Sequence, residues 1–208
     1  MITVTGRRTT FPVRMLIIAF ALILTGCAGS SSPSTFYMLR SMEGASPEKT
    51  SGAKGAKTVS VLLGPISLPG YLDRSQMVTV TGTHQLTLHE FNRWAESLRD
   101  GFYRVLQEDL STLLGTPDVY RYDQSESSTA DYQVVIDVTR FDAVPEGDAV
   151  LRAFWTLTQE ADTPSVTRKS VFRKPVSGMG FPEIVNAQNQ TINEFSREIA
   201  TAIKSAQN

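Results

Sequence analysis

Cysteine and histidine are scarce in this sequence. Cys27 is the only cysteine in 208 residues, so a disulfide within the chain cannot form and stability must come from core packing. The two histidines, His84 and His89, lie five positions apart. A metal centre needs more ligands than these, or the i, i+4 spacing of a histidine pair on a helix. We therefore expect no metal site.

Long apolar runs and excess positive charge are also lacking. The uncharged stretch from Met15 to Leu24 is about half the roughly 20 residues that a transmembrane helix needs. The chain holds 20 Lys and Arg against 21 Asp and Glu. Without the three arginines that precede residue 27, 17 basic residues remain against 21 acidic ones, a net charge of −4. This balance argues against a nucleic-acid partner.

Catalytic motifs are missing as well. The segment Gly55-Ala56-Lys57-Thr58 is similar to the end of a phosphate-binding loop, but Thr50 stands where that pattern requires a glycine. No Gly-x-Ser-x-Gly elbow occurs, and neither histidine has an obvious acidic partner for nucleophilic catalysis. We therefore expect a binding protein, not an enzyme, with no catalytic residues and no cofactor other than covalently attached lipid.

The N-terminus has the layout of a bacterial secretory signal. Three arginines precede the apolar stretch, and Leu24-Thr25-Gly26-Cys27 follows it. This tetrapeptide resembles a lipobox. The resemblance implies cleavage between Gly26 and Cys27, a diacylglyceryl group on the thiol of Cys27, and an N-acyl chain on the new amino terminus.

The implied anchor predicts location and domain layout. One acyl chain anchors a protein only marginally, whereas two or three on one cysteine would hold it on a membrane. Ala28 stands where an aspartate would resemble a signal for inner-membrane retention, so we expect the periplasmic face of the outer membrane. Residues 1–26 are then the signal peptide, 27–34 a lipidated Ser/Gly/Pro-rich tether, and 35–208 a single α+β periplasmic domain.

Hydrophobic patterning predicts the strands and turns of this domain. Apolar or alternating runs favour strands at 36–39, 59–68, 76–81, 85–88, 118–122, 132–139, 150–158 and 167–176. The intervening segment 41–58 is polar and is expected to be a loop. Short turns between strands favour a mixed or antiparallel sheet. On these strands Tyr132 and Trp155 are expected in the core.

Two amphipathic helices are expected to pack on the sheet. An apolar stripe from Phe91 to Leu114, which includes Trp94 as a core residue, predicts the first helix, ended by Gly115 and Pro117. Either a capping box, Thr87-x-x-Glu90, or Asn92 could start it. The second helix has Pro182 in its first turn and an apolar stripe from Ile184 to Ile203.

Several segments together carry a resemblance to one family. They are the lipobox, Phe36-Tyr37-Met38-Leu39, the run from Pro65 to Leu72, Arg93-Trp94-Ala95-Glu96-Ser97-Leu98 opening the first helix, and Val138-Thr139-Arg140-Phe141. In this order and spacing the sequence resembles the ABC-type transport auxiliary lipoproteins, the PqiC/YmbA-like group. The resemblance implies an accessory or docking component of an envelope lipid-transport system, with an MCE-domain (PqiB-like) transport protein as partner.

Candidate partner contacts follow from these segments. Pro69, Tyr71, Leu72, Asp73 and Arg74 form a loop bounded by proline and glycine, and such loops project rigidly. The alternative for this loop is a plain surface turn. Arg93 and Glu96 could bind a partner or brace the start of the first helix.

Two rival functions remain open at this point. The protein could be a structural or assembly lipoprotein of another outer-membrane complex, which predicts co-purification with a β-barrel protein. The other rival, a periplasmic enzyme, is disfavoured because no set of residues arranged for catalysis is apparent.

The number of copies is a separate open point. A homo-oligomeric ring would match the symmetry of a hollow transporter.

Overall fold

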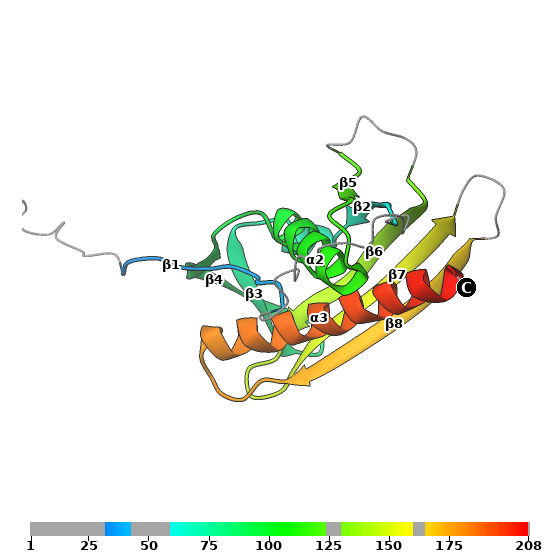
Figure 1. The fold of residues 1–208 in the computed structure, drawn as a ribbon. Helices are drawn as coiled ribbons and strands as arrows, with labels where there is room; N and C mark the ends of the chain where they lie inside the picture. The colour runs from blue at the N-terminus through cyan, green and yellow to red at the C-terminus, as the bar shows by residue number, and fades with distance from the viewer. Residues whose placement is uncertain (1–31, 43–58, 124–129, 160–164, 208) are drawn as a thin grey trace, which may run out of the picture. The chain divides into compact units, whose positions relative to one another are not determined.

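The computed structural model describes residues 32–42, 59–123, 130–159 and 165–207 (Figure 1). Gly26, Cys27 and nearly all of the predicted loop 41–58 lie outside these residues. The described elements are β1 (Thr35–Tyr37), β2 (Val61–Ser67), the short 3-10 helix η2 (Gly70–Leu72), β3 (Gln76–Gly82), β4 (Gln85–Trp94), α2 (Leu98–Leu114), β5 (Val119–Arg121), β6 (Tyr132–Ala143), β7 (Asp148–Gln159), β8 (Val166–Pro175) and α3 (Phe181–Ala206). Residues 34–208 make one compact unit.

The described strands form one mixed sheet organised around β6. Along one edge β6 pairs antiparallel with β7, and β8 follows. Along the other edge two strands run end to end, both parallel to β6: β2 beside residues 132–137, and β3 beside Ala143. Strand β5 lies beyond β2, while β4 and β1 lie beyond β3. The 3-10 helix η2, which follows β2 and precedes β3 in the chain, therefore lies along the edge of β6 between these two strands.

Both helices cover the same face of the sheet. Phe102 of α2 packs edge-on against Phe141 of β6, with 4.6 Å between ring centroids. Phe195 of α3 packs against Trp155 of β7 at 6.2 Å. Figure 1 shows α3 lying along β7 and β8 with α2 beside it. The predicted α+β class is confirmed, and so is the packing of two helices on a mixed sheet. Among the described residues, no helix has the length and apolarity needed to cross a membrane.

The predicted start of the first helix is wrong. Residues 85–94 form β4, so Phe91 and Trp94 lie on a strand. The segment Arg93-Trp94-Ala95-Glu96-Ser97-Leu98 is the end of this strand, a turn and the first residue of α2. Neither the Thr87-x-x-Glu90 capping box nor Asn92 caps the helix. The N-cap is Ser97, whose hydroxyl accepts a hydrogen bond from the backbone N–H of Asp100 at 3.1 Å. The predicted end is right: Gly115 adopts the left-handed conformation, φ 68°, that favours glycine.

An irregular register explains why only the first part of β4, the predicted strand 85–88, is recognisable as a strand. Met77 of β3 pairs with His89 of β4, so a regular ladder would pair Gln76 with Glu90. Gln76 pairs with Arg93 instead, and β4 therefore carries three extra residues at this point. Bulges of this kind break the period of two that identifies a strand. The core predictions nevertheless hold: Trp94, Tyr132 and Trp155 are all buried.

Candidate docking surface

The loop from Pro69 to Arg74 is fixed by both backbone and side chain. The N–H of Leu72 donates to the carbonyl of Pro69 at 2.9 Å, and that of Asp73 donates to Gly70. The side chain of Leu72 is buried in the core, while Asp73 and Arg74 are exposed. The buried side chain of Leu72 thus anchors the loop in the core, and the two charged residues that follow it, Asp73 and Arg74, lie exposed to solvent. Asp73 also faces Arg99 of α2 at 3.9 Å.

Tyr71 links this loop to β6. Its hydroxyl donates to the Oδ2 atom of Asp142 at 3.0 Å, and the Nε atom of Arg140 donates to Oδ1 of the same carboxylate at 2.8 Å. The Asp142 side chain is only 5% exposed. The hydrogen bonds from Tyr71 and Arg140 therefore replace those that water would make to this buried carboxylate. Burial and the nearby negative charge of Asp142 raise the pKa of Tyr71 to about 12. The hydroxyl therefore keeps its proton and remains a donor at neutral pH.

A shallow groove of about 350 Å³ lies beside this link, at the tip of the β3–β4 hairpin. It is lined by Tyr71, Val80, Gly82, Thr83, His84, Gln85, Leu86, Arg140 and Asp142. On the same side of the hairpin, Leu86 and Leu88 of β4 are 40% and 44% exposed, although leucines usually turn inward. Their cross-strand partners are Val80 and Val78. We call the loop 69–74, Arg140, Asp142, Leu86 and Leu88 the docking surface.

Arg93 and Glu96, predicted with the loop as partner contacts, have structural partners of their own. The Nε of Arg93 donates to the carbonyl of Glu90 at 2.8 Å. Glu96 pairs with Arg104 of α2, which also donates to the backbone carbonyl of Leu39 at 2.8 Å. The alternative bracing role fits Glu96, since its pair with Arg104 ties the turn before α2 to the helix.

The histidines are placed apart. His89 lies on β4, where its Nε2 is 2.8 Å from the hydroxyl of Thr79 and its ring meets Phe181 edge-on at 4.7 Å. Burial lowers the pKa of His89. His84 lies on the turn at the hairpin tip. Within the described ranges, no three His, Cys, Asp or Glu side chains are grouped as metal ligands would be.

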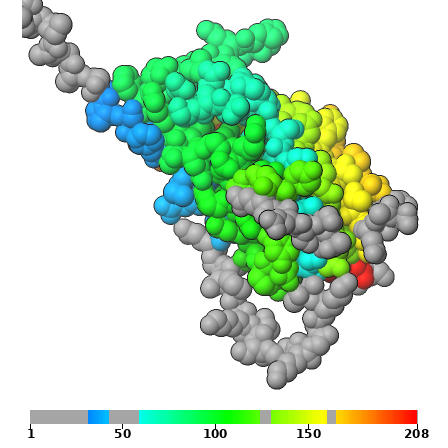
Figure 2. All heavy atoms as spheres, turned by 90° about the horizontal axis from the view of Figure 1, so that it is seen from above, coloured from blue at the N-terminus to red at the C-terminus, as the bar shows by residue number. Residues whose placement is uncertain are grey.

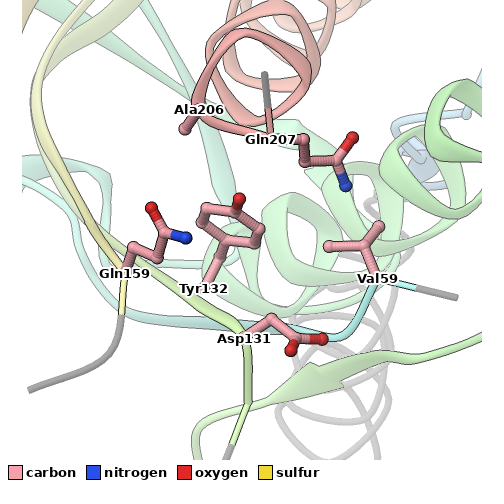
Figure 3. A pocket seen from close by; sticks show the side chains of 6 residues that line it. All are labelled: Val59, Asp131, Tyr132, Gln159, Ala206 and Gln207. Carbon is pink, nitrogen blue, oxygen red and sulfur yellow. The ribbon is translucent and has the colours of Figure 1, made fainter. Parts of the chain in front are cut away.

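A second pocket, of about 370 Å³, lies where the end of α3 approaches β6 and β7 (Figure 3). Val59, Asp131, Tyr132, Gln159, Ala206 and Gln207 line it. Asp131 is engaged within the protein, because it accepts hydrogen bonds from the N–H and the hydroxyl of Ser60 at 2.9 and 2.8 Å. We assign this pocket no role.

Sequence reasoning found the loop but missed what holds it. Asp142 and the two leucines were not singled out, although Arg140 belongs to the Val138–Phe141 segment of the family resemblance. One available signal was the aspartate directly after Phe141, since Asp142 follows a buried aromatic at the end of an apolar strand.

The match to a sequence family covers most of the domain. A model of the family described as ABC-type transport auxiliary lipoprotein component matches residues 37–200. The chain belongs to this family. By this family membership it is an auxiliary lipoprotein component of an ABC-type transport system. No curated protein matches its sequence.

Solved structures share the fold. The crystal structure of an uncharacterized protein is 21% identical, with a TM-score of 0.67, covering 83% of this chain and 99% of its own. A Xanthomonas campestris protein of the family named DUF330 is 17% identical, with a TM-score of 0.66, covering 84% of this chain and all of its own. At these identities the likeness is one of fold.

Proposed function

We propose that this protein is an outer-membrane lipoprotein, anchored through acylated Cys27, that docks an MCE-domain transport protein of the PqiB-like kind. Family membership supplies the transport-auxiliary role, and the sequence signal supplies the anchor. The observation that carries the docking role is the loop 69–74, locked to β6 through Tyr71 and Asp142 beside two exposed leucines.

The docking surface has the make-up of a protein interface. Interfaces combine an apolar centre with a polar, charged rim. Here Leu86 and Leu88 form the apolar part, and Asp73 and Arg74 stand as charged residues on the neighbouring loop. Because Leu72 and the hydroxyl of Tyr71 fix the loop before binding, less conformational entropy would be lost when a partner docks.

Binding, not catalysis, is the role that this chemistry supports. The titratable side chains lining the groove are Tyr71, His84, Arg140 and Asp142. Arg140 and Tyr71 both donate to the carboxylate of Asp142. The raised pKa of Tyr71 makes its hydroxyl a poor base or nucleophile at neutral pH. We therefore keep the expectation that the protein is not an enzyme and needs no cofactor besides its acyl chains.

The test is a cross-linked affinity pull-down of the full-length lipoprotein from intact cells, with mass spectrometry of the captured proteins. We expect an MCE-domain protein as the dominant specific partner. The variant Leu86→Ser/Leu88→Ser should reduce its recovery at least tenfold. Val171→Ser is the matched control, because Val171 is equally exposed, at 43%, but lies on β8. Capture of a β-barrel protein in place of the MCE protein would support the alternative, an assembly lipoprotein.

A homo-oligomer belongs to the same proposal. Copies arranged as a ring around one axis would present their docking surfaces together to a hollow transporter. Native mass spectrometry of the detergent-solubilised lipoprotein would give the number of copies, and a monomer alone would remove the ring from the proposal.

A further inference from the structure

Three large apolar side chains near the start of the domain are exposed to solvent. Phe36 of β1 is 62% exposed, Phe91 of β4 is 47% exposed, and Met38, which follows β1, is 44% exposed. Single exposed apolar residues are ordinary on protein surfaces, but a group on neighbouring strands points to an interaction site. We call these three residues the N-terminal apolar patch.

The register of β1 explains why the patch faces outward. Successive side chains of a strand point to opposite faces. Tyr37 packs on Phe181 of α3 at 5.8 Å, and Leu39 is buried, so Phe36 and Met38 point away from the helices. Phe36 is in register with Arg93 of β4. Phe91 directly precedes Asn92, which is in register with Thr35, so Phe91 lies beside the start of β1.

The patch is also the exposed apolar group closest in sequence to Cys27. Phe36 follows Cys27 by nine residues. Nine extended residues span about 30 Å, so an acylated Cys27 would keep Phe36 within about 30 Å of the membrane surface. Within the domain, Figure 2 shows the blue N-terminal residues at one end and the yellow residues of β7 and β8 toward the other.

We propose that the N-terminal apolar patch inserts into the lipid surface next to the anchor, so that the domain is held on the membrane in one orientation. Aromatic and aliphatic side chains on an otherwise polar surface bury themselves at the boundary between headgroups and acyl chains. The lipid surface is the occupant because the anchor holds it within reach of this patch at all times. The inference rests on the acylation of Cys27 in the proposed function and on nothing about the transporter.

The experiment uses the acylated protein in vesicles of phosphatidylethanolamine and phosphatidylglycerol, with no partner present. Acylation of Cys27 is first verified by intact mass, which also leaves an introduced cysteine as the only free thiol. An environment-sensitive fluorophore is attached at Met38→Cys or, as the control, at Lys169→Cys, an exposed position on β8. Lipids carrying a nitroxide near the headgroup then act as quenchers.

We expect at least threefold stronger quenching at position 38 than at position 169. The added change Phe36→Ser/Phe91→Ser should reduce quenching at position 38 to the control level, while circular dichroism shows an unchanged fold. Equal, weak quenching at the two positions would overturn the inference. So would protection of position 38 that occurs only when the transporter is added, because the patch would then be a protein interface. An unmodified Cys27 would overturn the anchor itself, whereas the pull-down with the Leu86/Leu88 variant tests docking separately.

Discussion

The two sides of the sheet, one covered by the helices and one open, differ in how far they bury large apolar side chains. On the side that α2 and α3 cover, Trp155 and Phe195 are at most 1% exposed and Phe172 packs against Phe195. On the open side, Leu86 and Leu88 of β4 and Phe154 of β7 are all at least 40% exposed. Each side chain that is buried lowers the free energy of the folded state, and each exposed one forgoes that gain. The first side therefore stabilises the domain, and the second is available for contacts with other molecules.

The largest effect is expected from truncation on the stabilising side. Phe195 is fully buried between Trp155 and Phe172. Phe195→Ala removes this contact and leaves a cavity, so the free energy of unfolding should fall by about 3–5 kcal/mol. Urea denaturation followed by tryptophan fluorescence measures it. A loss below 1 kcal/mol would mean that the two sides do not differ as described.

The next effect concerns Asp109, which connects the helices to the segment after β1. Its carboxylate is buried and accepts from the N–H of Met42 and the hydroxyl of Ser196, both at 2.8 Å. Asp109→Ala leaves both donors without this acceptor and should cost about 2–3 kcal/mol. Burial raises the pKa of Asp109, so the neutral amide in Asp109→Asn should cost less than about 1 kcal/mol in the same urea experiment. Equal losses in both variants would contradict this account.

A smaller effect is expected at Tyr71. Tyr71→Phe removes one donor to Asp142 and leaves Arg140, which should cost about 1 kcal/mol. The folded pKa of about 12 exceeds the ordinary value of 10.0. Between these values the unfolded chain has lost the proton that the folded protein retains, so stability falls as pH rises through this window. Ultraviolet titration at 295 nm should show one tyrosine near pH 12 that is missing in Tyr71→Phe. Identical titration curves would argue against the link to Asp142.

The smallest effect on stability is expected on the exposed side. Leu86→Ser/Leu88→Ser should change the free energy of unfolding by no more than about 0.5 kcal/mol per site, because the two side chains are 40% and 44% exposed and lie outside the buried core. The same variant should lose partner recovery, as described above. A stability loss above 2 kcal/mol would show that these leucines serve the core, and the difference between the two sides would disappear.

The sequence predicts the fold better where periodicity is undisturbed. The alternation of Tyr132, Val134, Ile136 and Val138 identified β6, and Pro182 with the following apolar stripe identified α3. Phe91 and Trp94 lie at helical spacing from Leu98 of α2, but they belong to β4, whose alternation is interrupted by three extra residues. Ser97 with Asp100 was the true start signal, a serine whose hydroxyl caps the helix.

The candidate site was predictable only in part. The loop 69–74 was recognisable from its proline and glycine. Its tie to Asp142 spans 71 positions and depends on β2 and β3 running end to end along β6. No local pattern indicates such a pairing, because it is decided by the topology of the whole sheet.

The attachment of β1 has a mechanical consequence. β1 runs parallel to β4, and the chain beyond it is held by hydrogen bonds from Arg104 to the carbonyl of Leu39, from the N–H of Arg40 to Asn189, and from the N–H of Met42 to Asp109. A pull on the chain upstream of Thr35, directed along the strand, stretches the bonds between β1 and β4 in shear, all at once. It would have to break them together before β1 could separate from the sheet. A domain tethered in this way would resist detachment by a moving transporter, although its first strand has only three residues.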